Sequence, residues 1–199
     1  WAPMSLPGQR EQYVMLMPPT KLRGDLLSLA DMGMDSRSFA RASGLSFDAI
    51  LAQDPISHGK LAEIYDHIGA AVSDDVTLQC GRSIKLQHLG LLGYRLSNCA
   101  TVGSILADWI EYCGHIGYPL IATLEIMGGS WRMHFHARYP LPIEAEKFCV
   151  TSTLAGFAQS LFNLSGHPIR LGRIGFPGPR RGSKAVLADL GADEVLFGQ

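Results

Sequence analysis

The stretch "LIATLEIMGGSWRMHFHA", from Leu120 to Ala137, decides the fold because a period of two runs on both sides of a glycine pair. Gly128 and Gly129 predict a two-residue turn, since such turns need the positive φ angles that glycine adopts readily. A two-residue turn fixes the register of the two strands and places an apolar residue opposite an apolar residue at four positions. The predicted pairs are Ile126 with Trp131, Leu124 with Met133, Ala122 with Phe135, and Leu120 with Ala137.

The other face of the predicted hairpin is polar and partly basic. The same register places Glu125 opposite Arg132, Thr123 opposite His134, and Ile121 opposite His136. A slip of one residue would mix the two faces, so the pattern itself specifies the pairing.

Two amphipathic helices are expected to cover the apolar face of the hairpin. The first is predicted over residues 101–115, where apolar residues recur at helical spacing from Val102 to Cys113 and Thr101 is a typical N-cap. The second is predicted over residues 143–165, with acidic residues near its N-terminus and Gly166 after its last turn. Helices on one face of a hairpin form a layered arrangement.

The sequence before the hairpin predicts short helices. We interpret residues 1–20 as a leader, residues 21–88 as an N-terminal helical subdomain, and residues 89–199 as an α+β subdomain. Within the helical part, Thr77 to Gln87 is interpreted as a loop followed by a short helical turn. Strands over 170–176 and 194–197 would add to a small mixed or antiparallel sheet. The predicted class is α+β and mainly helical: an N-terminal helical bundle plus a small sheet with a helix-covered hairpin.

Composition and charge indicate an ordinary globular protein. The 199 residues are 47% hydrophobic and 18% charged, with a formal net charge of -1 at pH 7. This balance lacks the basic excess of a typical nucleic-acid-binding domain, so we expect no specific DNA binding by this chain alone. No apolar run approaches the ~20 residues of a membrane span, and no secretory signal opens the sequence. We expect no membrane partner.

The cysteines favour a reducing compartment. Cys80, Cys99, Cys113 and Cys149 form no CxxC motif and have apolar neighbours. That pattern is more typical of buried thiols than of disulfides, so we expect a cytoplasmic protein.

His134 and His136 are the candidates for metal chemistry, because two imidazoles two residues apart on one strand face can chelate an ion. Two ligands are too few for a stable site, and Cys113 and His115 point in different directions from a helix. A solvated strand face and a lining for an organic ligand are the other interpretations. The sequence has no GxSxG, HExxH or GxxxxGKS motif, and no GxGxxG after a predicted strand. We therefore expect no enzyme activity, no catalytic residues, no resident metal and no cofactor.

Three segments together resemble a known family. They read "LADMGMDSRSFARASGL" from Leu29 to Leu45, "LGLLGYRLSNCATVGSILADWIEYCGHIGYPL" from Leu89 to Leu120, and "FPGPRRGSKAVLADLGADEVLFG" from Phe176 to Gly198. In this order and spacing they resemble the N-terminal effector-binding domain of AraC-type transcription regulators, which carries the historical label arabinose-binding. Family members continue into helix-turn-helix units, which are expected to be absent from this chain. The resemblance therefore implies a sensor that contacts DNA only through a missing C-terminal domain.

The resemblance and the hairpin together predict the ligand site of residues 89–199. We expect a small, largely apolar effector between the helices and the hairpin, with a polar end held near the rim by His115, His134 or Arg132. The residues expected to bind the ligand are Tyr94, Trp109, Tyr112, His115, Trp131, Arg132, Met133, His134, Phe135, Phe157 and Leu161.

Regulators of this type act on paired half-sites, so a homodimer is expected. Two alternatives stay open. One is a small metal- or haem-binding protein that uses His134 and His136, and the other is a dimerisation module without a small ligand.

Overall fold

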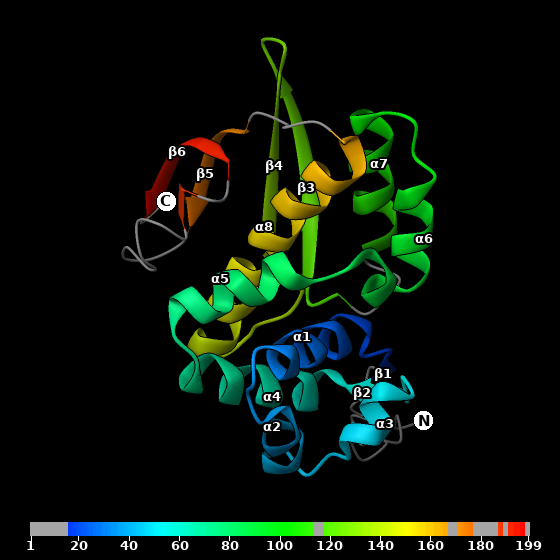
Figure 1. The fold of residues 1–199 in the computed structure, drawn as a ribbon, viewed down its shortest axis with the longest axis vertical. Coiled ribbons are helices and arrows are strands. Elements are labelled where there is room, and N and C mark those ends of the chain that lie inside the picture. Colours follow the sequence, from blue (N-terminus) through cyan, green and yellow to red (C-terminus); the bar gives the residue numbers. More distant parts are fainter. Residues whose placement is uncertain (1–15, 114–117, 167–170, 177–186, 189–190, 198–199) are drawn as a thin grey trace, which may run out of the picture.

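The structure is a computed structural model that describes residues 16–113, 118–166, 171–176, 187–188 and 191–197. It is mainly helical with small two-stranded sheets, which confirms the predicted α+β class (Figure 1). The helices are α1 (Thr20–Asp31), α2 (Ser36–Ala42), α3 (Phe47–Leu51), α4 (His58–Ala71), α5 (Asp74–Ser83), the 3-10 helix η1 (Leu86–Leu89), α6 (Leu91–Ser97), α7 (Val102–Cys113) and α8 (Ile143–Ser165). The strands are β1 (Leu16–Met17), β2 (Ile56–Ser57), β3 (Leu120–Met127), β4 (Ser130–Ala137), β5 (Leu171–Phe176) and β6 (Ala192–Phe197).

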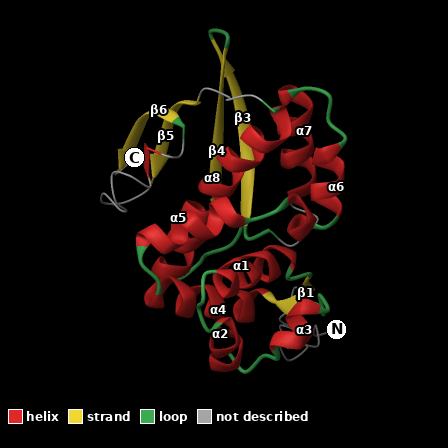
Figure 2. Cartoon of the chain, viewed as in Figure 1, coloured by secondary structure: helices red, strands yellow, loops and turns green. Residues whose placement is uncertain are grey.

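Helix α8 is the central element, and α4 and α5 pack along it (Figure 2). Its bounds match the predicted helix over residues 143–165, and Gly166 ends it with a φ of 64°. Two glycines allow the close packing. A Cβ added at Gly69 of α4 would overlap the carbonyl oxygen of Glu144, and one added at Gly81 of α5 would overlap that of Ser152. The three helices therefore meet backbone to backbone.

The interpretation of Thr77 to Gln87 as a loop and a short turn is wrong, because α5 covers Asp74–Ser83. The helix begins where the Ser73 side chain accepts a hydrogen bond from the Val76 N–H. Only Leu78 of its four buried residues is large and apolar, so the helical period is hidden: the others are Thr77, Cys80 and Gly81.

The hairpin has the predicted register at every pair from Leu120 with Ala137 to Ile126 with Trp131. Gly128 and Gly129 form the turn with φ angles of 55° and 83°. Helix α7 also forms as predicted, and the Thr101 hydroxyl accepts a hydrogen bond from the Ser104 N–H at its start.

The helices cover the base of the hairpin but leave its tip exposed, which corrects the expectation of a wholly covered apolar face. Leu120 and Ala122 are buried. Ile126 is 71% exposed and Trp131 is 48% exposed. In Figure 1 the tip extends beyond the ends of α7 and α8. The hairpin is longer than the helices beside it can cover.

The remaining strands form separate pairs rather than one sheet. β5 and β6 pair in parallel, and together with α5 and α8 they enclose a second, smaller core that includes Leu78, Ile174 and Phe176. β1 pairs with β2, so the last part of the predicted leader is attached to the fold through the buried Met17. Residues 1–15 of that leader lie outside the described residues. One continuous core runs from Met17 to Leu161, and the subdomain boundary at residues 88 and 89 stays a prediction.

Candidate functional site

Aromatic rings from α7, α8 and β4 meet over the base of the hairpin. The ring centroids of Trp109 and Phe157 are 5.0 Å apart, and those of Phe135 and Phe157 are 5.5 Å apart. Tyr118, just before β3, has its ring 6.0 Å from that of Trp109. All three contacts have edge-to-face geometry, which aromatic pairs prefer. We call Trp109, Tyr118, Phe135 and Phe157 the aromatic cluster.

The aromatic cluster contains three of the predicted ligand residues, and two more belong to the same layer. Leu161 is buried one helical turn beyond Phe157, and Met133 packs half-buried against the core. Tyr118 was not among the predicted ligand residues. Its place before a predicted strand and next to Pro119 gave no periodic signal.

The other predicted ligand residues face elsewhere. Tyr94 is 71% exposed on α6, and Trp131 lies at the hairpin tip, where its ring approaches Gly103. The guanidinium carbon of Arg95 lies 4.0 Å from the centroid of the half-buried Tyr112 ring. Arg132 and His134 are exposed on the polar face of the hairpin. His115 lies outside the described residues.

The structure gives the metal or haem alternative no further ligands among the described residues. There, no three His, Cys, Asp or Glu side chains gather in an arrangement that could hold a metal ion. His134 Nε2 lies 3.6 Å from a carboxylate oxygen of Glu125, and both side chains are largely exposed. This arrangement is a solvated cross-strand pair.

A second cluster, none of whose residues was predicted as a site, lies between α1, α4 and α8. The Lys21 Nζ donates to Asp25 Oδ2 at 2.6 Å and to Ser152 Oγ at 3.0 Å. The Tyr65 hydroxyl donates to the same Asp25 oxygen at 2.9 Å. Lys21, Asp25, Tyr65 and Ser152 are all buried, and we call them the buried ion-pair cluster.

Burial and charge act against each other in this cluster. Burial alone would lower the pKa of the Lys21 ammonium, but the charge of Asp25 and the hydrogen bond to it raise that pKa above its ordinary value. Burial raises the pKa of the Asp25 carboxyl, against the pull of Lys21 and Tyr65. Two donors converge on one carboxylate oxygen, one of them an ammonium at 2.6 Å, so we treat the pair as ionised. The core tolerates the Lys21–Asp25 pair because its two opposite charges compensate each other.

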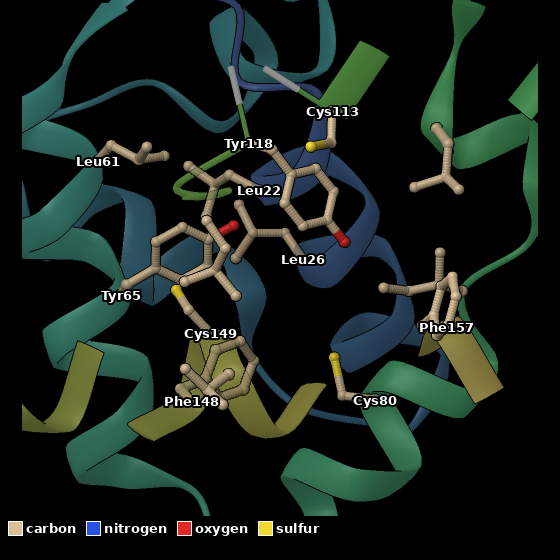
Figure 3. Close-up of a cluster of buried hydrophobic side chains, with 14 of the residues drawn as sticks. Leu22, Leu26, Leu61, Tyr65, Cys80, Cys113, Tyr118, Phe148, Cys149 and Phe157 are labelled. Atoms are coloured by element: carbon tan, nitrogen blue, oxygen red, sulfur yellow. The ribbon is translucent and has the colours of Figure 1, made fainter. Parts of the chain in front are cut away.

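Tyr118 joins the two clusters. The Lys21 Nζ lies 5.5 Å from the Tyr118 ring centroid, and the Trp109 ring makes an edge-to-face contact with the same ring. Figure 3 shows the Tyr118 ring beside Leu22 and Leu26, with its hydroxyl directed toward the side on which Phe157 lies. Burial raises the pKa of the phenol to about 12, so it is neutral at pH 7.

Some buried polar atoms around these clusters lack a hydrogen-bond partner among the described residues. They include Asp25 Oδ1, Ser28 Oγ and Trp109 Nε1. Buried polar atoms are rarely left unpaired, because an unmade hydrogen bond is costly in a dry interior. The two clusters therefore combine an apolar lining with open hydrogen-bonding capacity, which is typical of a site for a small organic molecule.

Among the described residues, none of the helices combines the length and the apolar character needed to span a membrane. No curated relative matches the chain. The model of one family, described as the arabinose-binding domain of AraC transcription regulators, N-terminal, matches residues 33–199. This match covers most of the chain and confirms the resemblance seen in the three quoted segments. The chain therefore belongs to the family of N-terminal arabinose-binding domains of AraC transcription regulators, the ligand-sensing regulatory part of such proteins.

Proposed function

We propose that this domain senses a small, largely apolar effector held between α7, α8 and the base of the hairpin, and that it has no enzymatic activity. The observation that carries the proposal is the aromatic cluster, in which rings from α7, α8 and β4 meet and Trp109 Nε1 has no hydrogen-bond partner among the described residues. The proposed lining is Trp109, Tyr118, Met133, Phe135, Phe157 and Leu161. This lining leaves out the predicted ligand residues that face elsewhere: Tyr94, Tyr112, Trp131, Arg132 and His134.

Binding at this place would act on the arrangement of the helices. Phe157 lies on α8, which also carries Ser152 of the buried ion-pair cluster and packs along α4 and α5. An effector that prefers one packing of α7 and the hairpin on α8 shifts the population toward that packing. The shift would control a DNA-binding domain outside this chain, in the cytoplasm.

Self-association is part of the proposal. The long helix α8 is mostly buried and offers little free surface to a second copy. The exposed apolar tip of the hairpin is therefore a better candidate for the dimer interface than α8. Ile126, Met127 and Trp131 are its large exposed residues. Sedimentation at micromolar concentration should give a dimer that Trp131→Glu weakens. A strict monomer would remove dimerisation from this domain.

The effector site is tested with two variants on the same helix. Phe157→Ala removes a ring of the aromatic cluster, whereas Phe162→Ala removes a ring that is 51% exposed. Isothermal titration with decanol as an apolar probe should show binding to the wild type and to Phe162→Ala, and altered affinity for Phe157→Ala. Native mass spectrometry of freshly purified protein should show a retained organic molecule. Equal binding by both variants, or binding of no probe and no retained molecule, would contradict the proposed site.

Metal analysis distinguishes the proposed effector-binding domain from the alternative, a metal- or haem-binding protein. A stoichiometric metal or haem retained by the wild type and lost in a His134→Ala/His136→Ala variant would favour it over an organic effector. We expect neither.

A further inference from the structure

One side chain of the hairpin tip contacts α7, although the tip around it is exposed. The Trp131 ring lies over the first turn of α7 at Gly103, where a Cβ would come within 2.8 Å of Trp131 Cη2 and 3.6 Å of Trp131 Cζ3. Resting on the proposed effector site, we infer that Trp131 and Gly103 form a latch that holds α7 against the hairpin. The effector enters the site by opening this latch.

The first support is the glycine itself. Gly103 is the second residue of α7, and glycine in a helix is less favourable than alanine. The atoms nearest to its missing Cβ are the Cη2 and Cζ3 atoms of Trp131. An alanine at this position would improve the helix but would displace the ring, whose Cη2 is at the far end of the side chain. The missing side chain is therefore what allows the ring to lie on α7.

The second support is that α7 and β4 each carry residues of both the latch and the aromatic cluster. On β4, Trp131 and Phe135 are four residues apart, so they lie on the same face, about 13 Å from each other along the strand. On α7, Gly103 and Trp109 are six residues apart, about 9 Å along the helix. Phe157 contacts both Trp109 and Phe135. Helix α7 is therefore joined to this face of the hairpin at two places, by the latch near the tip and through the aromatic cluster at the base.

The third support is that the aromatic cluster is closed. The ring centroids of its contacting pairs lie 5.0 to 6.0 Å apart, which is the separation of rings in direct contact. An effector that enters among these rings must therefore separate α7 from α8 and the hairpin base. Because a helix moves as a rigid element, the same movement pulls Gly103 away from Trp131. The latch contact opposes binding, and its loss favours the arrangement that binds the effector.

Two glycine variants at the same helical position test the latch. Gly103→Ala displaces the Trp131 ring, whereas the Cβ of Gly59→Ala, at the second residue of α4, would meet nothing within 4 Å. In isothermal titration, Gly103→Ala should bind decanol roughly twofold to fivefold more tightly than the wild type, because one ring contact no longer opposes opening. Gly59→Ala should bind decanol as the wild type does. Trp131→Leu, which removes the ring, should match Gly103→Ala, and the double variant should bind no more tightly than either single variant.

Urea denaturation separates the latch from a contact that only stabilises the fold. Gly103→Ala should bind more tightly without a loss of stability, because alanine favours the helix. Decanol binding by Gly103→Ala that is equal to or weaker than that of the wild type would overturn the latch and leave the effector site in place. A further tightening when Gly103→Ala is added to Trp131→Leu would also overturn it, because the effect would not depend on the ring.

A fluorine label reports the latch directly. The chain has three tryptophans, and labelling with 4-fluorotryptophan leaves Cη2 and Cζ3 of each ring unsubstituted. The Trp131 signal in the fluorine NMR spectrum is the one that Trp131→Leu removes. Gly103→Ala should shift this signal, and decanol should shift the wild-type signal in the same direction.

A Trp131 signal that Gly103→Ala leaves in place would overturn the latch whether or not decanol binds. If decanol binds to neither the wild type nor Gly103→Ala, the coupling of the latch to the effector site is rejected. The proposed function is rejected as well when native mass spectrometry also finds no retained molecule.

Discussion

The two halves of α8 are packed in different ways. Its N-terminal half lies against α4 and α5 with backbone contacts at Gly69 and Gly81 and holds Ser152 against Lys21. Its C-terminal half presents Phe157 and Leu161 to α7 and the hairpin, where rings and long side chains make the contacts. Backbone contact permits one arrangement, whereas side-chain layers can repack. The first half of α8 is therefore a scaffold, and we propose the second half as part of the sensing layer.

The largest expected effect is the loss of one partner of the buried ion pair. Asp25→Ala leaves the Lys21 ammonium buried without its counterion, which should lower the free energy of unfolding by about 3–5 kcal/mol. Urea denaturation measures it. The matched control is Lys21→Met/Asp25→Leu, which removes both charges and should cost much less. A single variant as stable as the wild type would show that this half of α8 is not held by the pair.

The next effect tests the backbone contact. Gly81→Ala places a Cβ against the Ser152 carbonyl and the Ala155 methyl group, so α5 must move away from α8. We expect a loss of roughly 1–3 kcal/mol, the usual cost of overpacking. Gly59→Ala on α4 is the control, because its Cβ would meet nothing within 4 Å, and it should be neutral or slightly stabilising. Equal effects in urea melts would contradict the contrast.

The same contrast explains which parts of the fold the sequence could predict. The hairpin register followed from the alternation and from Gly128-Gly129, since one face is apolar at its base and both signals are local. Helix α5 was missed because Thr77 and Gly81 occupy its buried face. The usable signal was Ser73 followed by Asp74 and Asp75, a typical capped and acidic helix start.

The candidate site was predictable only in its apolar half. Trp109 and Phe157 lie on periodic helix faces, so their meeting over the hairpin could be expected. Lys21 and Asp25 lie four residues apart, which is the spacing of an ordinary ion pair on the surface of a helix. Only the covering by α4 and α8 makes them internal, and no local pattern encodes that covering. The hairpin tip was misjudged because the pattern gives strand length but not the reach of neighbouring helices.

A smaller effect separates the base of the hairpin from its tip. Trp131→Ala removes one cross-strand pair with Ile126 and the approach of the ring to Gly103 of α7, which should together cost about 1 kcal/mol. Leu120→Ala at the buried base should cost roughly 2–5 kcal/mol. Thermal unfolding of both variants gives the comparison. A tip variant as damaging as the base variant would mean that the tip is covered in solution.

The smallest expected effect lies outside both halves of α8, at the surface ion pair between α6 and α7. Arg95 binds Asp108 through two hydrogen bonds of 2.9 and 3.2 Å and stacks on Tyr112. The hydrogen bond from Arg95 lowers the pKa of the Asp108 carboxyl. A depressed carboxyl pKa contributes stability that is present above the unfolded pKa and is lost as the pH falls through the folded pKa.

Arg95→Ala should therefore lower stability slightly at pH 7 and not at all in strong acid, and high salt should shrink the difference. Carboxyl NMR should show the Asp108 pKa rising toward its ordinary value in the variant. Arg37→Ala is the control, because Arg37 also lies over a ring, that of Phe47 at 4.8 Å, but its one hydrogen bond to Asp48 is 3.5 Å long and both side chains of that pair are largely exposed. An Arg95 effect that persists in acid and in salt would come from packing on Tyr112 rather than from charge. The junction of α6 with α7 would then belong with the scaffold, and the sensing layer would be confined to the C-terminal half of α8 and the hairpin base.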